Sequence, residues 1–423
     1  MSPLRLLSLA FYGLAMGLIA PAVPAWLRSR VRRGKEDPGR WRERLGRPSV
    51  ARPEGRLAWL HGVSVGESLS LLPLAERLRA VAPGLTVLIT TGTMASAEVL
   101  AARRPEGVLH QYAPLDTPGA TRAFLDHWRP EIGVLAESEL WPNLILTARR
   151  RGVRLALVSA RLSDGSLRGW RRAPGAAKAV LRAFDLVLAR NGAAAEGLTS
   201  LGARVDGLAD LKFGAPVLPG DAAALAAARA ELGDRPLILA ASTHPGEEEI
   251  ILAAFTGIPR GRRPVLVIVP RHPVRGPDII NPARTQGLSV GLRSAGARLG
   301  EDDVHVADTL GELGLFYRLA SLAVVGGSFG DPAVGGHNPL EPARLDCPFI
   351  TGPNVSAWLV YAVLTASGAT QCVSAQDLPG WFARAVAGDP ALRILAERAA
   401  KVVALGDAEV ASAMDRIVGM LPP

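Results

Sequence analysis

Beyond residue 50 the chain alternates between short apolar runs and amphipathic segments. Apolar runs of about four to eight residues are typical of buried strands, and helical segments between them indicate parallel sheets covered by helices. The runs that we predict as strands are Leu57–His61, Thr86–Thr90, Ile132–Ala136, Leu155–Ser159, Leu186–Ala189, Leu237–Ala241, Val265–Val269, Ser289–Gly291 and Leu322–Val325. The segments that we predict as helices are Ser68–Ala80, Ala95–Arg103, Gly119–His127, Leu140–Arg150, Glu247–Phe255 and Leu310–Leu319. The pattern predicts an α/β fold.

The rhythm of strands and helices is interrupted between Phe213 and Arg235. There Pro216, Pro219 and Gly220 precede an alanine-rich segment, which indicates a linker followed by a new helix. We therefore predict two doubly wound domains, over residues 36–212 and 213–423, the second with closing helices at its C-terminus. Two such domains that face each other hold a ligand in the cleft, at the carboxyl ends of the strands.

The N-terminal segment differs from the rest of the chain. Leu6–Leu27 has 22 residues without a charged side chain, enough for a helix to cross a hydrocarbon core of about 30 Å, although Pro21 and Pro24 shorten its most apolar part. The basic residues that follow are Arg28, Arg30, Arg32, Arg33, Lys35, Arg40, Arg42, Arg44 and Arg47. Because such charge stays in the cytoplasm, we predict residues 1–35 to be a single-pass anchor with the domains on the cytoplasmic face. The alternative is a signal peptide cleaved near Ala22–Ala25.

Composition excludes several classes of protein. A chain of 423 residues with 48% hydrophobic residues is long enough for two sizeable cores, and its two cysteines make neither a disulfide framework nor a metal cluster. Aromatic residues make up only 5%, without basic–aromatic interleaving or zinc-finger spacing, so no nucleic-acid module is predicted. We assign the net charge of +9 to contacts with lipid headgroups or an acidic substrate.

The first candidate site is a glycine-rich loop. The strand Leu322–Val325 leads into the pairs Gly326–Gly327 and Gly335–Gly336, and we expect a short helix to begin at Pro339. Bare backbone N–H groups and a helix N-terminus at a strand end favour a bound anion, and Glu341 is suited to accept both hydroxyls of a ribose. The spacing matches neither the dinucleotide fingerprint nor the P-loop, so a turn needed only for packing is an equal alternative.

A second candidate is Glu67, which follows the strand Leu57–His61. Glu67 lies three residues after Ser64, which is also the spacing of a helix capping box. Gly62 and Gly66 are expected to leave space around this carboxylate, where it would act as a general base toward a substrate hydroxyl.

Further polar residues follow other predicted strands. Glu137 and Glu139 have an acidic-x-acidic spacing similar to metal–nucleotide motifs, although pairing with arginines or helix capping is the favoured interpretation. Arg271 has a guanidinium suited to a phosphate, with a surface arginine as the alternative. Lys212 lies at the hinge, within reach of either domain. Ser242, Thr243 and His244 are expected to face the cleft. The acidic residues that begin the next predicted helix are favourable at the positive end of its dipole.

Taken together, these motifs closely resemble the transferases of 3-deoxy-D-manno-octulosonate (Kdo) in Gram-negative lipopolysaccharide synthesis, over almost the whole chain. The segments that carry the resemblance are His61–Glu67, Asp116–Pro118, Glu137–Asn143, Ala160–Ser163, Leu211–Phe213, Pro270–Pro273, Asp308–Leu313 and Gly335–Ala343. Val274, Gly276 and Asp210 depart from the family pattern, which weakens detailed roles for their loops.

The resemblance implies a GT-B glycosyltransferase, with two Rossmann-like domains, the acceptor mainly on the first and the donor mainly on the second. It implies CMP-Kdo as donor, a lipid A precursor as acceptor at the inner membrane, an inverting reaction with Glu67 as base, and no cofactor or metal. The donor contacts that it implies are Arg271, Gly327, Ser328, Gly335, Gly336, Asn338 and Glu341. The phosphate or acceptor contacts are Lys212, Ser64 and Arg161. No oligomeric state follows from the sequence.

Three alternatives stay open. A sugar-nucleotide 2-epimerase has a related two-domain scaffold, but that class lacks an apolar N-terminus. A non-catalytic protein that binds anionic lipid would have no use for carboxylates at strand ends. A metal-dependent transferase would use Glu137 and Glu139.

Overall fold

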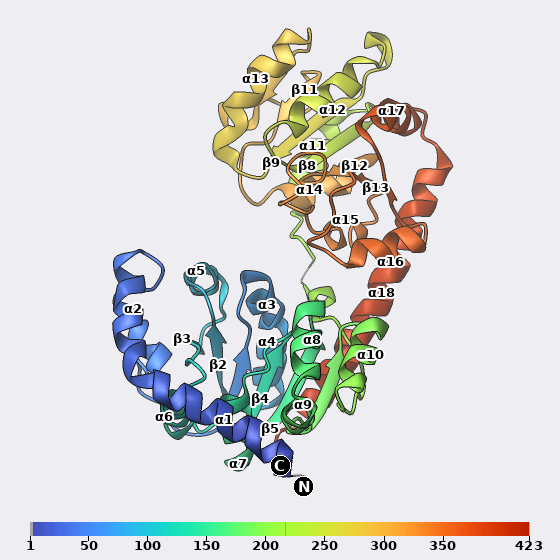
Figure 1. Cartoon of the computed structure of the whole chain (residues 1–423). Helices are drawn as coiled ribbons and strands as arrows, with labels where there is room; N and C mark the ends of the chain where they lie inside the picture. The colour runs from blue at the N-terminus through green and yellow to red at the C-terminus, as the bar shows by residue number, and fades with distance from the viewer. Residues whose placement is uncertain (1–2, 216, 423) are drawn as a thin grey trace. The chain divides into compact units, whose positions relative to one another are not determined.

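The computed structural model describes residues 3–215 and 217–422, with side chains from residue 8 onward in the first helix. The chain divides into two compact units, and each is built on a seven-stranded sheet whose paired strands are parallel. Unit 1 comprises Met1–Ala215 and Gly406–Pro423, and unit 2 comprises Pro216–Leu405. Figure 1 shows each sheet flanked by helices. The predicted α/β fold with two domains is confirmed.

Unit 1 has the strand order β3-β2-β1-β4-β5-β6-β7. Its strands are β1 (Leu57–His61), β2 (Thr86–Thr91), β3 (Val108–Tyr112), β4 (Ile132–Ala136), β5 (Arg154–Ala160), β6 (Leu186–Ala189) and β7 (Gly207–Leu208). Its α-helices are α1 (Pro3–Ile19), α2 (Val23–Arg32), α3 (Val65–Ser70), α4 (Leu72–Val81), α5 (Met94–Arg103), α6 (Pro118–Trp128), α7 (Pro142–Arg150), α8 (Asp164–Arg171), α9 (Pro174–Leu181) and α10 (Gly192–Ser200). The strand order reverses between β1 and β4, so the loops after these strands form the ligand-binding edge of a doubly wound sheet.

Unit 2 has the strand order β10-β11-β9-β8-β12-β13-β14 and reverses between β8 and β12. Its strands are β8 (Leu237–Thr243), β9 (Val265–Pro270), β10 (Val290–Leu292), β11 (Val304–Val306), β12 (Leu322–Val325), β13 (Phe349–Thr351) and β14 (Gln371–Cys372). Its α-helices are α11 (Ala222–Leu232), α12 (Glu247–Thr256), α13 (Gly276–Thr285), α14 (Leu313–Leu319), α15 (Leu340–Ala343), α16 (Val360–Ala366) and α17 (Leu378–Val386), followed by α18 (Pro390–Val418). The two central strands, β8 and β12, are wholly apolar over their paired residues and lie in the core.

The division of the chain differs from the prediction at both ends of unit 2. The boundary lies between residues 215 and 216, a few residues after the predicted one. The last residues, from Gly406, belong to unit 1, so their assignment to the second domain is wrong. The physical reason is apolar burial: Val410, Ala413 and Ile417 of α18 are buried in the cluster that includes Leu60 and Val134 of the unit 1 sheet.

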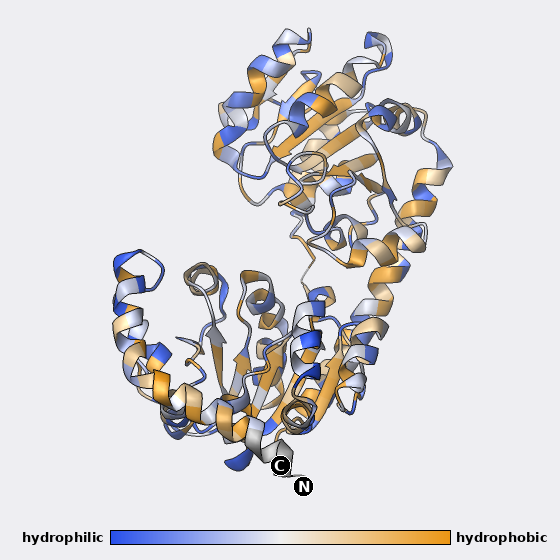
Figure 2. Ribbon diagram, in the orientation of Figure 1, coloured by the Kyte–Doolittle hydropathy of each residue, from blue (hydrophilic) through white to orange (hydrophobic). Residues whose placement is uncertain are grey.

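The N-terminal helix packs along unit 1. Among the described residues, Ser8–Arg32 is long and apolar enough to cross a membrane, judged by length and composition only, and Figure 2 shows α1 as mainly apolar. Helix α1 lies against α9 and α6. The hydroxyl of Tyr12 donates a hydrogen bond to Asp116 Oδ2 at 2.9 Å. One face of α1 is therefore docked on the protein, whereas the other exposes Phe11, Leu14 and Leu18.

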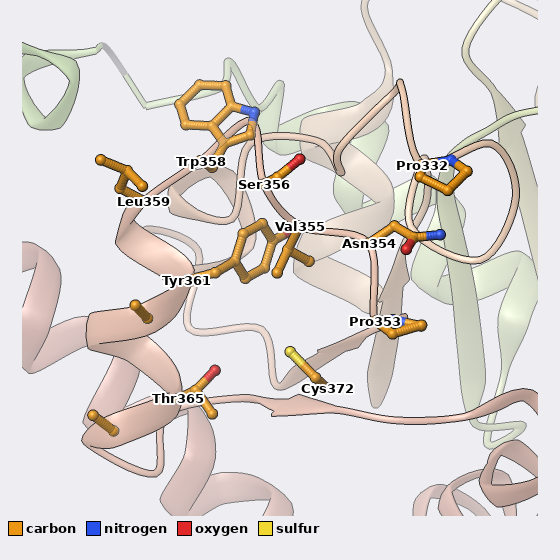
Figure 3. A pocket seen from close by; sticks show the side chains of 12 residues that line it. Pro332, Pro353, Asn354, Val355, Ser356, Trp358, Leu359, Tyr361, Thr365 and Cys372 are labelled. Carbon is orange, nitrogen blue, oxygen red and sulfur yellow. The ribbon is translucent and has the colours of Figure 1, made fainter. Parts of the chain in front are cut away.

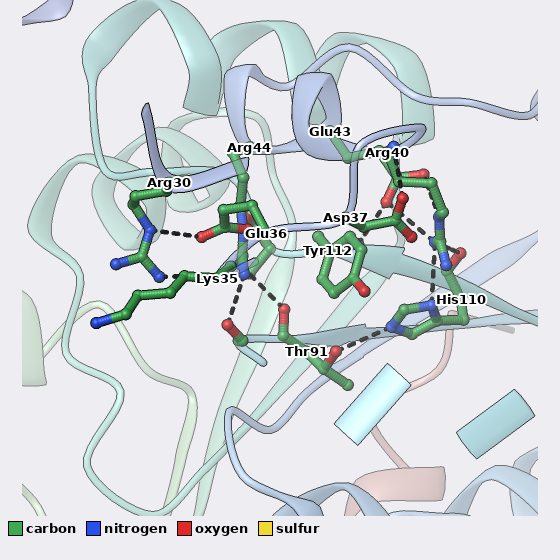
Figure 4. Close-up of polar contacts among 12 residues, drawn as sticks. Arg30, Lys35, Glu36, Asp37, Arg40, Glu43, Arg44, Thr91, His110 and Tyr112 are labelled. Atoms are coloured by element: carbon green, nitrogen blue, oxygen red, sulfur yellow. Dashed lines mark hydrogen bonds and ion pairs between the residues drawn. The ribbon is translucent and has the colours of Figure 1, made fainter. Parts of the chain in front are cut away.

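The basic segment after α2 is partly internal, as Figure 4 shows. Arg44 is buried, with its Nε 3.2 Å from Glu36, and Arg40 pairs with the buried Glu43 at 3.0 Å. Both guanidinium groups lie 4.8 Å from the ring centre of Tyr112. These arginines stabilise the fold, so the charge available to lipid headgroups is smaller than the sequence predicts. The basic residues that stay exposed are Arg28, Arg32, Arg33, Lys35, Arg42 and Arg47.

Candidate functional site

Glu67 lies at the ligand-binding edge of unit 1, in the first turn of α3. Its Oε2 accepts a hydrogen bond from the Val63 N–H at 2.8 Å, and its Oε1 accepts one from the Ser64 hydroxyl at 2.7 Å. The Ser64 Oγ in turn accepts from the Glu67 N–H at 3.3 Å, as the cap of α3. The capping geometry is therefore present. A carboxylate has about four acceptor positions, so each oxygen retains a lone pair for a further donor.

The two glycines beside Glu67 have different roles. A Cβ on Gly62 would lie 3.0 Å from the Cβ of Glu67, so this glycine allows close packing, and the expectation that it opens space is wrong. At Gly66 the nearest atom to such a Cβ is Cε of Lys212, at 3.9 Å. Such a Cβ would make only an ordinary contact, so Gly66 leaves space between the Glu67 loop and the lysine.

A cluster of charged side chains follows β4 on the same edge. Glu137 is buried, and its carboxylate is 2.7 Å from Arg161 Nε and 3.1 Å from Lys212 Nζ. Arg190 pairs with Asp210 at 2.8 Å and lies 3.9 Å from Glu137. Burial raises the pKa of Glu137, but Lys212 and Arg161 lower it more, so the net shift is downward.

This arrangement gives Glu137 a clear role. The favoured interpretation, that Glu137 pairs with basic side chains, agrees with the structure. Lys212 and Arg161, which were predicted separately, both contact this carboxylate. Glu137 has a φ of 58°, an uncommon backbone conformation for a residue other than glycine and one that clusters at functional sites. The sequence did not reveal this feature, because backbone strain has no side-chain signature.

In unit 2, the glycine loop after β12 is held by a buried carboxylate. Glu247 accepts hydrogen bonds from the N–H groups of Gly327 (2.7 Å), Ser328 (2.8 Å) and Phe329 (2.9 Å), and from that of His244 (2.9 Å). The prediction that the N–H groups of Gly327 and Ser328 face a ligand is therefore wrong. They bind a carboxylate of the protein itself, which fills the anion site that the loop provides.

The hydroxyl of Ser328 is also used internally. It donates to the Val325 carbonyl at 2.7 Å and accepts from the Gly352 N–H at 2.9 Å, in a fully buried side chain. Ser328 thus shapes the loop, and its predicted direct contact with the nucleotide is not supported by this geometry.

Most of the remaining predicted donor residues lie near the start of α15. This helix has four residues and begins at Leu340, so its dipole is weaker than a full helix would provide, and Pro339 precedes it. Asn338 Oδ1 accepts from the Leu340 N–H at 3.1 Å, and Asn338 Nδ2 is 3.5 Å from Glu341 Oε1. Gly335 and Gly336 have φ angles of 70° and 81°, which only glycine adopts readily.

Arg271 follows β9 and has an exposed side chain. Its N–H donates to the Thr243 carbonyl at 2.9 Å, which connects the loops after β8 and β9. The guanidinium is thus available at the same strand-end edge as the glycine loop.

A pocket of about 770 Å³ borders this glycine loop (Figure 3). Trp358, Leu359, Tyr361 and Cys372 contribute to its mainly apolar wall. The Tyr361 hydroxyl donates to the carbonyl of His337 at 2.9 Å, which fixes the backbone of the loop. Sequence reasoning missed this segment, because it has neither a charge pattern nor a glycine signature.

Comparison of the sequence with known proteins identifies the family of this chain. The sequence model of 3-deoxy-D-manno-octulosonic-acid transferase (kdotransferase) matches residues 39–215. The 3-deoxy-D-manno-octulosonic acid transferase of Bordetella pertussis is 35% identical over 414 residues, which cover 92% of this chain and 94% of that protein. The chain belongs to the Kdo transferase family. A probable mitochondrial Kdo transferase of Arabidopsis thaliana is 38% identical over 353 residues, which cover 80% of this chain and 78% of the plant protein.

A solved structure gives the same fold class. A glycosyltransferase of Rickettsia africae has a TM-score of 0.55 at 11% identity, over 87% of this Kdo transferase and 99% of that chain. At this identity the likeness shows the fold alone, which is of the GT-B type. Membership of the Kdo transferase family makes the chain a glycosyltransferase, so the epimerase and the non-catalytic lipid-binding protein are set aside.

Proposed function

We propose that this Kdo transferase moves Kdo from CMP-Kdo to a hydroxyl of a lipid A precursor in one inverting displacement. Glu67 takes the proton of the acceptor hydroxyl as its oxygen bonds to the anomeric carbon. The bond from that carbon to the phosphate oxygen breaks at the same time, and CMP leaves with the electron pair. Attack opposite the leaving group inverts the configuration.

The observation that carries the proposal is the surplus of positive charge beside Glu67. Arg161, Arg190 and Lys212 outnumber Glu137 and Asp210 in the cluster next to the Glu67 loop. A phosphorylated acceptor is attracted to such a cluster, and its hydroxyl would then be positioned near the carboxylate.

On the donor side, we assign the nucleotide to the strand-end edge of unit 2. Arg271 would bind a phosphate, and Glu341 would accept the hydroxyls of the ribose. Gly335 and Gly336 would let the nucleotide approach the backbone closely.

We also propose that the transferase works at the cytoplasmic face of the inner membrane, through α1. The docked face of this helix, fixed by Tyr12 and Asp116, favours a helix that lies in the membrane surface over the predicted single crossing. Its exposed apolar face, with Phe11 73% and Leu18 74% exposed, would then enter the lipid, next to exposed arginines that attract anionic headgroups.

The reaction needs no metal in this proposal. Among the described residues, no group of three or more His, Cys, Asp or Glu is arranged to hold a metal ion. A metal-dependent variant relies on Glu137 and Glu139, and Glu137 is paired with Lys212 and Arg161.

The experiment that tests the proposal uses the full chain with a lipid A precursor and CMP-Kdo, with product masses measured in the presence and absence of EDTA. We expect an added Kdo mass and the same rate in both conditions. No added mass would contradict the assigned substrates, and loss of activity in EDTA would contradict metal independence.

A further inference from the structure

Two histidines face each other at the strand-order reversal of unit 2. His244 follows β8, His337 belongs to the loop after β12, and their Nε2 atoms lie 2.9 Å apart. Their rings are nearly parallel, 13° apart with centres at 5.1 Å. At this separation one Nε2 donates its proton to the other, so the pair holds a single proton between these two atoms.

The surrounding protein fixes the pair in place. Glu247 accepts the N–H of His244, and the same carboxylate binds the loop that carries His337. Gly327 has a φ of 69°, and a Cβ there would lie 3.1 Å from Nε2 of His337. A larger residue at 327 would therefore crowd the imidazole, as well as Val334, whose Cγ1 would lie 2.8 Å from that Cβ. Both residues are partly exposed, so a ligand can approach them.

Histidine and arginine side chains face the pair. His272 lies with its ring centre 6.3 Å from that of His244, and Arg271 and Arg275 belong to the same loop. Arg275 is paired with Glu248 at 2.8 Å, whereas the carboxylate of Glu247 is already satisfied by backbone N–H groups. The site thus has the positive charge of Arg271 and the polar atoms of the imidazoles.

An anion bound at this edge needs hydrogen-bond donors other than these N–H groups of the glycine loop, because they already have acceptors. The N–H groups of Gly327, Ser328 and Phe329 are bound to Glu247, and the N–H of Gly336 donates to the Gly327 carbonyl at 2.8 Å. The imidazoles of His244 and His337 are polar groups that can still bind a ligand. They lie at the strand-order reversal, where doubly wound sheets bind their ligands.

We propose that the paired imidazoles of His244 and His337 bind the phosphate of the cytidine nucleotide, with Glu247 as the residue that positions them. The proposal rests on CMP-Kdo being the donor. The phosphate replaces the hydrogen bond between the imidazoles and accepts one from each Nε2 atom. The imidazole whose Nε2 accepted that bond keeps its Nδ1 proton and takes up one proton from solvent at Nε2, so it becomes a cation.

The electrostatics of the free protein agree with proton uptake. Burial, His244 and Arg271 lower the pKa of His337 to about 4, although Glu247 opposes them. Burial also lowers the pKa of His244, where Glu247 raises it and His272, Arg271 and Arg275 lower it. The empty pair is therefore neutral at pH 7, and an adjacent phosphate favours its charged form.

The test measures binding of CMP and of cytidine to the full chain by calorimetry at pH 7, in two buffers of different ionisation enthalpy. The variants are His337→Gln, His244→Gln and the double variant, with His127→Gln of unit 1 as control. Glutamine retains an N–H donor but cannot take up a proton. We expect proton uptake on CMP binding in the wild type and the control, and its loss in each variant.

We also expect CMP affinity to fall about tenfold in either single variant, since a charged hydrogen bond becomes a neutral one. The double variant should fall little further, and cytidine affinity should not change. Unchanged CMP affinity and proton uptake in both single variants would overturn the inference, as would an equal loss for cytidine, which would mean a structural role. If the wild type transferred no Kdo, the proposed function would fail instead.

Discussion

Glu247 accepts hydrogen bonds from four backbone N–H groups of two loops, and its side chain is fully buried. Glu137, also buried, is instead paired with basic side chains. Glu67 is half-buried and has one hydrogen-bond partner on each oxygen. The neighbours of each glutamate thus decide its role. Glu247 positions a loop, Glu137 organises a cationic cluster and Glu67, as we propose, accepts a proton.

The loop-positioning role of Glu247 makes a prediction about stability. In Glu247→Gln one oxygen becomes an NH₂ group that faces backbone N–H donors, so at least one buried N–H loses its acceptor. We expect the variant to lose about 2–4 kcal/mol of unfolding free energy. Chemical denaturation measures this loss, with the exposed Glu249→Gln as the control on the same helix turn. Equal stability of the two variants would contradict the role.

At the scale of elements, strands with continuous apolar runs were predictable, and several short or interrupted strands were not. β1, β4, β6 and β12 have the predicted bounds, because continuous apolar runs mark strands that are buried on both faces. β3 and β11 were missed because His110 and His305 interrupt their short apolar runs.

The candidate site was predictable only in part, because many of its contacts join residues that are far apart in the sequence. The sequence located Glu67, Lys212 and Arg161, but it did not show that Lys212 and Arg161 both meet Glu137. Likewise it identified the acids at the start of α12 as partners of the helix dipole. Glu247 binds instead to a loop about 80 residues later, at Gly327, which no local pattern indicates.

Helix α1 makes a prediction at this same scale. Replacing Phe11 and Leu18 with serine removes apolar surface from its exposed face, each side chain contributing about 1.5–3 kcal/mol when fully buried in lipid. We expect binding to vesicles that contain anionic lipid to fall at least tenfold, measured by co-sedimentation. Ala10→Ser, on the exposed side of the same helix, is the control. Retention of the double variant in membranes after alkaline carbonate washing would instead indicate a helix that crosses the bilayer.

At the scale of the whole molecule, the C-terminal helix makes the two units interdependent. α18 begins in unit 2 and contributes Val410, Ala413 and Ile417 to the core of unit 1. Unit 1 therefore needs residues from Gly406 onward to complete its core, although the predicted domain 213–423 included them.

Ile417→Ala tests this interdependence. The side chain is fully buried, so we expect a loss of about 2–5 kcal/mol in unfolding free energy. Limited proteolysis should show faster cleavage within residues 57–215, with Leu405→Ala, an exposed position of the same helix, as control. Faster cleavage confined to unit 2 would contradict the assignment.

The proposed reaction of the whole molecule depends on one carboxylate, Glu67. The most direct test is the rate of Kdo transfer from CMP-Kdo to a lipid A precursor by Glu67→Gln, with Glu76→Gln, an exposed position of α4, as control. Glutamine can still accept the Val63 N–H, so the fold should be retained, but it cannot accept a proton. The account predicts a loss of about 10²–10⁴ in kcat for Glu67→Gln and wild-type activity for the control. A folded Glu67→Gln protein with wild-type kcat would contradict the account.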